Sequence, residues 1–427
     1  MQRIKPVTRS ADRAAPRKRK LKPSTQMMGH GYDPRLSEGA LKPPIFLTST
    51  FVFESAEAGK RFFQGVVSGK PDSAAGLVYG RFNGPDQEIL EDRLGLWEEA
   101  EDALAFSSGM AAIATVLLAF VKAGEVIVHS APLYAATETL IGKVLARFGV
   151  RFADFPAGAS PDEIRAALAR GASLGPIGMI YLESPANPTN ALVDVEAVKA
   201  ARDALPGDHR PPIVIDNTFL GPLWAKPLRQ GADLVVYSLT KYAGGHSDLV
   251  AGGALGPKAM VDPVRATRNV TGTILDPHSA WMLLRSLETL ELRMTRAGEN
   301  AAKVCAFLRR HPKVERVGYL GFLEDDSRQA DIFRRHCSGA GSTFSLYLKG
   351  GEREAFAFLD ALKIAKLAVS LGGTETLASH PASMTHLSVP PERKALLGIG
   401  DNLVRISIGV EDADDLIADM EHALNEI

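Results

Sequence analysis

Cysteine is scarce in this sequence, since only Cys305 and Cys337 occur among its 427 residues. They form no CxxC pair and no spacing typical of zinc ligands, so we expect neither a disulfide scaffold nor a metal site. No apolar run approaches the ~18 residues that a membrane-spanning helix needs, and no apolar stretch follows the basic N-terminus as it would in a secretory signal. These absences favour a soluble, cytoplasmic protein that contacts no membrane.

The sequence has no overall excess of charge. Its 49 Lys and Arg residues nearly balance 50 Asp and Glu residues, giving a net charge of −1. The composition therefore does not favour nucleic acid as a partner. Basic residues are nevertheless concentrated in residues 1–22, which hold nine Lys or Arg and one acidic residue, Asp12. We interpret residues 1–22 as a disordered, solvated tail; binding of this tail to nucleic acid or to a membrane is the less favoured alternative.

Two common nucleotide-binding motifs are missing. No GxxxxGK[ST] sequence occurs, which excludes an ATPase of the P-loop type. No GxGxxG sequence opens the first strand–helix unit, which weakens a dinucleotide-binding interpretation.

Residues 86–257 alternate helical patterns with short apolar runs. Apolar runs separated by helices predict an α/β fold with a mainly parallel sheet covered on both faces. Ligands bind such sheets beyond the carboxyl ends of the strands, so the residues directly after each run are candidates for a site. Helices are expected at 86–99, 111–121 and 161–170. The seven runs are ALAF (103–106), VIVH (126–129), VRFADF (150–155), GMIYLE (178–183), PIVIDN (212–217), DLVVYS (233–238) and GGALG (252–256).

The segments on either side of this region have a different composition. Residues 23–75 are rich in Pro, Gly, Ser and Thr, which predicts little regular structure. We interpret residues 23–78 as an N-terminal arm that contacts a neighbouring subunit. We expect a large domain at 79–277 and a smaller α+β domain at 278–427, joined through one long helix at 279–310. In the smaller domain, strands are expected at 341–349 and 404–410, and helices at 351–364 and 412–426.

The strongest chemical signal follows the run at 233–238. Ser238, Thr240 and Lys241 come directly after this predicted strand, and two hydroxyls beside a lysine suit a bound phosphate and a reactive amine. Taken alone the pattern is weak, because a lysine after a strand is usually solvated. Gly244 and Gly245 indicate close backbone approach nearby, without identifying what approaches.

A second phosphate signal follows the run at 103–106. Ser107, Ser108, Gly109 and Met110 lead directly into an Ala-rich helical pattern. Small residues that open a helix leave free N–H groups at its positive end, which favours a phosphate. An ordinary serine N-cap is the alternative interpretation.

Three further residues follow neighbouring strands and could serve a pyridine ring. Asp216 ends the run at 212–217, and a carboxylate there would keep a ring nitrogen protonated. Asn187 follows the run at 178–183 and could reach the ring's 3-oxygen, while Tyr134 follows the run at 126–129 and could stack on the ring. A turn aspartate and a core tyrosine are the ordinary alternatives. The coincidence of all these signals at carboxyl ends of neighbouring runs favours a site.

These residues belong to motifs that resemble the Cys/Met-metabolism family of pyridoxal 5′-phosphate (PLP) enzymes. The resemblance extends from about Gly29 to the C-terminus and implies a type I aminotransferase-like fold. It also implies a homotetramer built from two tight dimers. The motifs are YGRFNGP (79–85), AFSSGMAA (105–112), YLESPANPTN (181–190), VIDNT (214–218), YSLTKYAGGHSD (237–248), SLGGTETLASHPASMTH (370–386) and VRISIGVED (404–412).

The resemblance implies roles on the cofactor side. Lys241 would carry PLP as a Schiff base and move protons, Asp216 would pair with the ring nitrogen, and Tyr134 would stack on the ring and act as an acid or base. The phosphate would be held within the subunit by Gly109, Met110, Ser238 and Thr240. Tyr79 and Arg81 would instead reach the phosphate of the neighbouring subunit.

On the substrate side, the resemblance implies that Arg405 clamps the α-carboxylate of a small amino acid and that Ser370 positions the lysine and substrate. The expected reaction is γ-elimination or γ-replacement on a sulfur amino acid or an O-acylhomoserine. A PLP-binding regulator of DNA, the alternative from another class, would need a helix-turn-helix domain that the short tail cannot form.

The choice among members of the family depends on few positions. Members that bind cystathionine by its distal amino group tend to have a glutamate directly before the serine of SLGG, where this chain has Val369. Methionine γ-lyases typically carry a cysteine two residues after the stacking tyrosine, where this chain has Ala136. The chain also has NGP at 83–85 in place of NPT, and about ten extra residues at 65–74. We expect a methionine γ-lyase-like enzyme, with O-acylhomoserine sulfhydrylase or cystathionine γ-synthase as alternatives.

Overall fold

The computed structural model describes residues 21–67, 76–387 and 389–427. Most of the basic tail, at 1–22, and most of the extra segment, at 65–74, lie outside the described residues. Within the described part, no helix is both long enough and apolar enough to cross a membrane.

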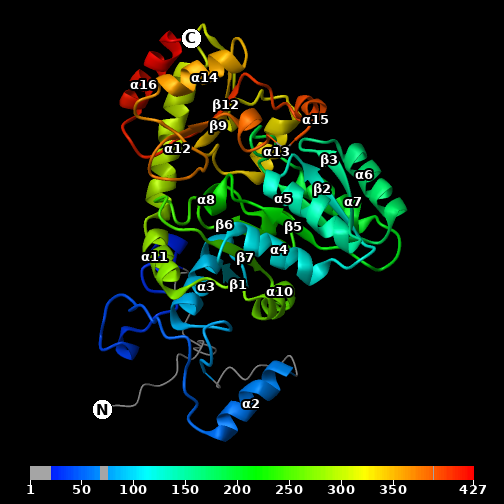
Figure 1. The fold of residues 1–427 in the computed structure, drawn as a ribbon, viewed down its shortest axis with the longest axis vertical. Coiled ribbons are helices and arrows are strands. Elements are labelled where there is room, and N and C mark those ends of the chain that lie inside the picture. Colours follow the sequence, from blue (N-terminus) through cyan, green and yellow to red (C-terminus); the bar gives the residue numbers. More distant parts are fainter. Residues whose placement is uncertain (1–20, 68–75, 388) are drawn as a thin grey trace.

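A seven-stranded sheet forms the centre of the molecule (Figure 1). All seven apolar runs form strands, so the predicted sheet is confirmed. The only antiparallel strand is β7, which pairs with β1 and β6, while the remaining neighbours are parallel. In spatial order the strands are β1 (Asp102–Phe106), β7 (Gly252–Gly256), β6 (Leu234–Ser238), β5 (Ile213–Asp216), β4 (Ile177–Glu183), β2 (Val126–Ala131) and β3 (Arg151–Pro156).

Helices cover both faces of this sheet, because alternate residues of most of its strands supply apolar side chains to both faces. One face packs against α3 (Pro85–Glu98), α6 (Pro161–Leu174), α7 (Val195–Asp203) and α11 (Pro277–Leu287). The other face packs against α4 (Gly109–Phe120), α10 (Lys258–Thr271) and the turns η2 (Leu140–Val144) and η3 (Leu145–Phe148). The short helices that connect strands are α5 (Ala135–Thr139), α8 (Gly221–Trp224) and α9 (Pro227–Gln230).

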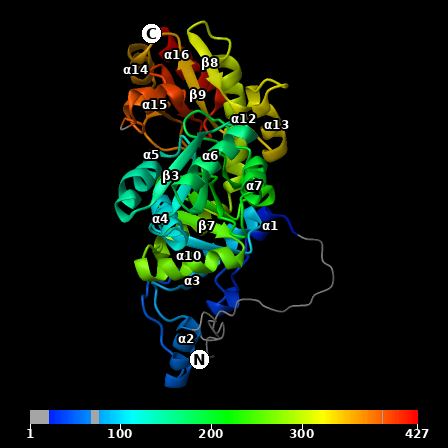
Figure 2. The ribbon, with the colours of Figure 1, turned by 90° about the vertical axis from the view of Figure 1, so that its right-hand side faces the viewer.

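A second, five-stranded sheet lies above the first in Figures 1 and 2, with its own apolar core. Its order is β10 (Lys366–Leu367), β11 (Leu377–Ser379), β12 (Leu403–Ser407), β9 (Thr343–Leu348) and β8 (Val314–Gly318). This core also receives α12 (Leu290–Leu308), α14 (Glu352–Ala361) and α16 (Ala413–Asn425). The remaining elements of this part are η4 (Leu320–Phe322), α13 (Arg328–His336), η5 (Pro381–Ser383) and α15 (Pro391–Leu396).

The prediction of one helix at 279–310 is wrong. The segment forms α11 and α12, which are separated at Glu288 and Thr289. The interruption coincides with a charged contact to an earlier part of the chain, since the Glu288 carboxylate lies 3.5 Å from the buried guanidinium of Arg93. This contact cannot be foreseen from the helical periodicity of the segment.

The N-terminal arm is more regular than predicted. It contains α1 (Pro23–Gln26), η1 (Pro34–Leu36) and α2 (Ala56–Val67), and α2 projects below the central sheet in both views (Figures 1 and 2). The rings of Phe53, Phe62 and Phe63 pack against one another, with centroids 5.5 to 6.5 Å apart. Composition alone missed α2 because glycines within it weakened the helical signal.

Candidate active site

The candidate site lies at the carboxyl edge of the large sheet. β1 and β6 are both antiparallel to β7, so β1 runs in the same direction as β2, β4, β5 and β6. The segments that follow these strands, including Ser107–Met110, Tyr134, Asn187, Thr218 and Lys241, therefore emerge at one edge. The shared strand direction accounts for how residues far apart in the sequence are brought to one site.

Lys241 is partly buried, and its side chain is hydrogen-bonded to Ser370, in the part of the chain that contains the second sheet. Its Nζ donates to Ser370 Oγ at 2.8 Å. Burial, helped by the positive charge of Arg405, lowers the pKa of Lys241 to about 8. A free lysine has a pKa near 10.4, so far more of the Lys241 amine is neutral near pH 8 than in water. A neutral amine is the form that attacks a carbonyl or accepts a proton.

Arg405, on β12, joins the two parts of the site. Its Nη2 donates to Ser370 O at 2.8 Å, and its Nη1 donates to Asn187 Oδ1 at 3.2 Å. Burial lowers the pKa of Arg405 to about 10, and within the described residues no Asp or Glu pairs with it. A buried guanidinium without a counterion suits an incoming carboxylate, which it can bind through two parallel hydrogen bonds.

Ser370 has an unusual backbone conformation, with φ at 135°. A residue with a side chain rarely adopts this region, and such strain is concentrated at functional sites. The conformation lets Ser370 use its hydroxyl to accept from Lys241 and its carbonyl to accept from Arg405.

Asp216 ends β5 and is 7% exposed. It accepts a hydrogen bond from Thr218 N at 2.9 Å, and burial raises its pKa. Within the described residues no Lys or Arg pairs with it, so the position suits a protonated ring nitrogen. Thr218, which sequence reasoning missed, also accepts from Ser238 N at 2.8 Å and thereby links the strands β5 and β6. Its place in VIDNT was the available signal.

The N-terminus of α4 approaches Ser238. Ser108 caps the helix, its Oγ accepting from Ala111 N at 2.9 Å. A Cβ atom added to Gly109 would lie 2.9 Å from Ser238 Cβ, so only glycine permits this close approach. The free N–H groups at the start of α4 and the Ser238 hydroxyl therefore form a cradle suited to a phosphate. The Met110 side chain lies beside it and accepts from Thr137 Oγ1 at 3.8 Å.

Gly109→Ala is expected to weaken PLP binding about tenfold, because relieving an overpacked contact of this kind costs about 1–3 kcal/mol. Titration of the apo-protein with PLP, followed by absorbance, measures the change. Gly351→Ala is the matched control, since a Cβ there would meet nothing within 4 Å. Equal PLP affinity in the Gly109 variant and the wild type would contradict the assigned cradle.

The Thr240 hydroxyl is hydrogen-bonded to the backbone of Ala251. Its Oγ1 donates to Ala251 O at 3.2 Å and accepts from Ala251 N at 3.0 Å. Its role in phosphate binding stays a prediction.

Tyr134 precedes α5 and is 41% exposed. Its N–H donates to Glu183 Oε2 at 2.7 Å, at the carboxyl end of β4. Tyr134 is thereby held at the carboxyl edge of the sheet. Glu183, which holds the Tyr134 backbone, is a second residue that sequence reasoning missed, although it begins the ESPANP run.

Tyr79 and Arg81 are placed apart from the Lys241–Arg405 group. The Arg81 guanidinium donates to Asn269 O near the end of α10, and Tyr79 is 41% exposed and bridges to Thr50. Their contact with a neighbouring subunit's phosphate stays a prediction.

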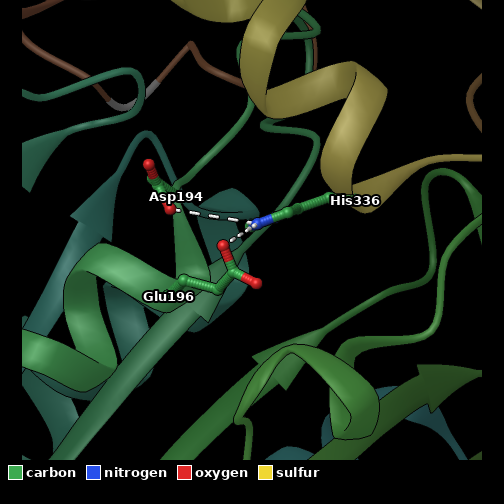
Figure 3. Close-up of side chains that lie close together, drawn as sticks. All are labelled: Asp194, Glu196 and His336. Atoms are coloured by element: carbon green, nitrogen blue, oxygen red, sulfur yellow. Dashed lines mark ion pairs between the residues drawn. The ribbon is translucent and has the colours of Figure 1, made fainter.

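A separate cluster of ligand-type side chains joins α7 to α13. Figure 3 shows Asp194, Glu196 and His336 pointing toward one another. The guanidinium of Arg335 already pairs with both carboxylates, with Nη2 at 2.8 Å from Asp194 Oδ2 and Nη1 also paired with Glu196. We therefore assign this cluster to packing of α13 against the large sheet's helices, not to a metal.

A type I fold, a partly buried lysine, a phosphate cradle and an Asp216 that pairs with no cation in the described part of the chain are the features of a PLP-dependent enzyme. The sequence profile of the family described as "Cys/Met metabolism PLP-dependent enzyme" matches residues 24–425. The chain therefore belongs to the family of PLP-dependent enzymes of cysteine and methionine metabolism, and the resemblance inferred from the motifs is confirmed.

Individual relatives agree with this assignment. The chain is 40% identical to an L-methionine gamma-lyase of Fusobacterium nucleatum subsp. polymorphum, over 91% of this chain and 94% of that protein. It is 34% identical to an O-succinylhomoserine sulfhydrylase of Pseudomonas aeruginosa, over 91% of this chain and 92% of that protein. The crystal structure of cystathionine gamma synthase from Xanthomonas oryzae pv. oryzae superposes with a TM-score of 0.85 at 31% identity, covering 96% of this chain and 99% of that one.

Proposed function

We propose that the protein is a γ-lyase that acts on methionine or homocysteine. The observation that carries the proposal is the 40% identity to an L-methionine gamma-lyase, against 34% to an O-succinylhomoserine sulfhydrylase, over the same share of this chain. Val369 also supports it: this apolar side chain, 57% exposed, directly precedes Ser370. An apolar entrance suits a thioether better than a second amino group.

Bound PLP supplies an electron sink that stabilises negative charge at the substrate's carbons. Lys241 would hold the cofactor and accept the α-proton at its Nζ. Asp216 would keep the ring nitrogen protonated, and Asn187 would bind the 3-oxygen. The phosphate would be held by Gly109, Met110, Ser238 and Thr240.

The substrate is oriented from the other side of the site. Arg405 binds the α-carboxylate, and Ser370 holds both Arg405 and Lys241 through its carbonyl and hydroxyl. The α-carbon is thereby presented to the Lys241 amine. Tyr134 would stack on the ring and donate a proton to the leaving sulfur.

An O-acylhomoserine sulfhydrylase or a cystathionine γ-synthase is the second candidate. Ala136, in the first turn of α5, favours it, because the resemblance implies a cysteine at this position in methionine γ-lyases. Either candidate uses the same Lys241, Asp216 and Arg405.

The proposed assembly is a homotetramer of two tight dimers in the cytoplasm. The N-terminal arm at 23–78 then contacts the neighbouring subunit, and Tyr79 and Arg81 complete its phosphate site. The exposure of Tyr79 supports this arrangement. The proposed division of the subunit is a large PLP-binding domain at 79–277 and a small domain at 278–427.

Incubation of the purified protein with methionine is expected to yield methanethiol, ammonia and 2-oxobutyrate, one of each per methionine and water consumed. The keto acid is measured directly, in parallel with cystathionine and with O-acetyl- or O-succinylhomoserine plus sulfide. Homocysteine formed from the acylated substrates, with no keto acid from methionine, would contradict the assignment as a lyase and support the second candidate.

A further inference from the structure

Glu183 is a buried carboxylate that neither the reaction roles above nor the sequence motifs account for. It ends β4 and is 4% exposed. Its Oε2 accepts from Tyr134 N at 2.7 Å, and its Oε1 accepts from Asn187 N at 3.1 Å. Both oxygens thus accept hydrogen bonds from backbone N–H groups, and these N–H groups lie in two loops that follow different strands.

The two loops carry different groups of the site. One presents the Tyr134 ring. The other presents Asn187, whose Oδ1 accepts from Arg405 Nη1 at 3.2 Å. A continuous path of hydrogen bonds therefore runs from the Tyr134 backbone through Glu183 and Asn187 to the Arg405 guanidinium.

Glu183 also lies beside Asp216. The two residues are register partners on the neighbouring parallel strands β4 and β5, so their side chains lie on the same face of the sheet. Burial and the adjacent Asp216 raise the pKa of Glu183. The backbone of Glu183 is fixed as well, since its N–H donates to Ser130 Oγ on β2 at 3.0 Å. A side chain held this firmly can set the position of its neighbours.

We propose that Glu183 is a positioning residue whose single carboxylate fixes the positions of both the cofactor-stacking tyrosine and the carboxylate-binding arginine. It does so by fixing the backbone of Tyr134 directly and the guanidinium of Arg405 through Asn187. The inference rests on the proposed roles of Tyr134 and Arg405. It explains why a carboxylate is placed where no substrate or cofactor atom needs one.

Glu183→Gln tests the proposal, because a glutamine side chain has one acceptor oxygen and one NH₂ donor. Only one of the two backbone N–H groups can then be satisfied, and the other faces a donor. We expect KM for the amino-acid substrate to rise and PLP affinity to fall, each by about tenfold or more. We also expect a change in the visible circular dichroism of bound PLP, because the Tyr134 ring is no longer held in place.

Asp419→Asn is the matched control. Asp419, on α16, is 5% exposed and its two oxygens also accept from backbone N–H groups, those of Lys363 at 2.7 Å and Ala365 at 2.9 Å. The same acid-to-amide change there is expected to lower the melting temperature while KM, PLP affinity and the dichroism stay at wild-type values.

Two results would overturn the proposal. The first is a folded Glu183→Gln protein whose KM, PLP affinity and dichroism are unchanged. The second is an equal loss of substrate and PLP affinity in Glu183→Gln and Asp419→Asn that follows only the melting temperatures of the two variants. If the glutamine variant does not fold, Glu183→Asp retains both acceptors on a shorter side chain, and the same readings are expected to shift less but in the same direction. Unchanged readings in that variant would also overturn the proposal. PLP affinity and dichroism need no turnover, so they report on Glu183 even if methionine is not the substrate.

Discussion

Lys241→Ala is expected to yield a protein that does not attach PLP covalently. Its turnover of the amino-acid substrate is expected to be at least about 10³-fold slower, because the variant loses both a nucleophile and a proton-transfer group. The reason is geometric as well as chemical. The Lys241 side chain is partly buried, its pKa is lowered to about 8, and its Nζ lies 2.8 Å from Ser370 Oγ. Absorbance of the purified protein with PLP, and product formation with the active substrate, measure the two effects.

Lys226→Ala is the matched control for this result. Lys226 is another lysine whose pKa is lowered by burial, but its Nζ lies 5.9 Å from the centre of the Trp97 ring. We expect this variant to keep the visible absorbance band of bound PLP and most of its activity. Retention of the band by Lys241→Ala, or its loss in Lys226→Ala alone, would contradict the assignment of the cofactor lysine.

Arg405→Lys is expected to lower kcat/KM by about 10²–10³-fold, mainly through KM, because an ammonium cannot reproduce the paired hydrogen bonds of a guanidinium. The lysine head would also leave Asn187 Oδ1 or Ser370 O without its present donor. Initial rates over a range of substrate concentrations separate the effect on KM from that on kcat.

Arg202→Lys provides the comparison for a buried arginine. Arg202, on α7, is 8% exposed and pairs with Asp203 and Asp233. Asp233 lies at the amino ends of β5 and β6, opposite to the carboxyl edge that carries the site. We expect it to alter the melting temperature and to leave KM unchanged. A change in KM of less than about threefold in Arg405→Lys would be too small for the loss of a bidentate pair and would remove Arg405 from the substrate site.

The large sheet was predictable because six of its seven strands are buried along most of their length, the edge strand β3 being the exception. Runs such as 126–128 and 213–215 are apolar throughout, and this pattern is typical of parallel strands between helices. The short strands β10 and β11 have two and three residues, too few to give a pattern. The break at Glu288 coincides with a contact to the distant Arg93, which no local pattern contains.

The site was predictable where chemistry follows a strand directly. Ser238, Lys241 and Asp216 fall at the carboxyl ends of neighbouring runs, and the topology brings them to one edge. Arg405 lies within a strand of the other sheet, so only the family motif identified it. Glu183 and Thr218 act through backbone N–H groups of other segments, and such contacts depend on register and loop conformation that the sequence pattern does not specify.

Reduction of the PLP-bound protein with borohydride, followed by proteolysis and mass spectrometry, tests the central claim most directly. The treatment fixes the cofactor to the lysine that holds it. The account predicts the added pyridoxyl mass on Lys241 alone. The same mass on another lysine such as Lys226, or no labelled peptide, would contradict it.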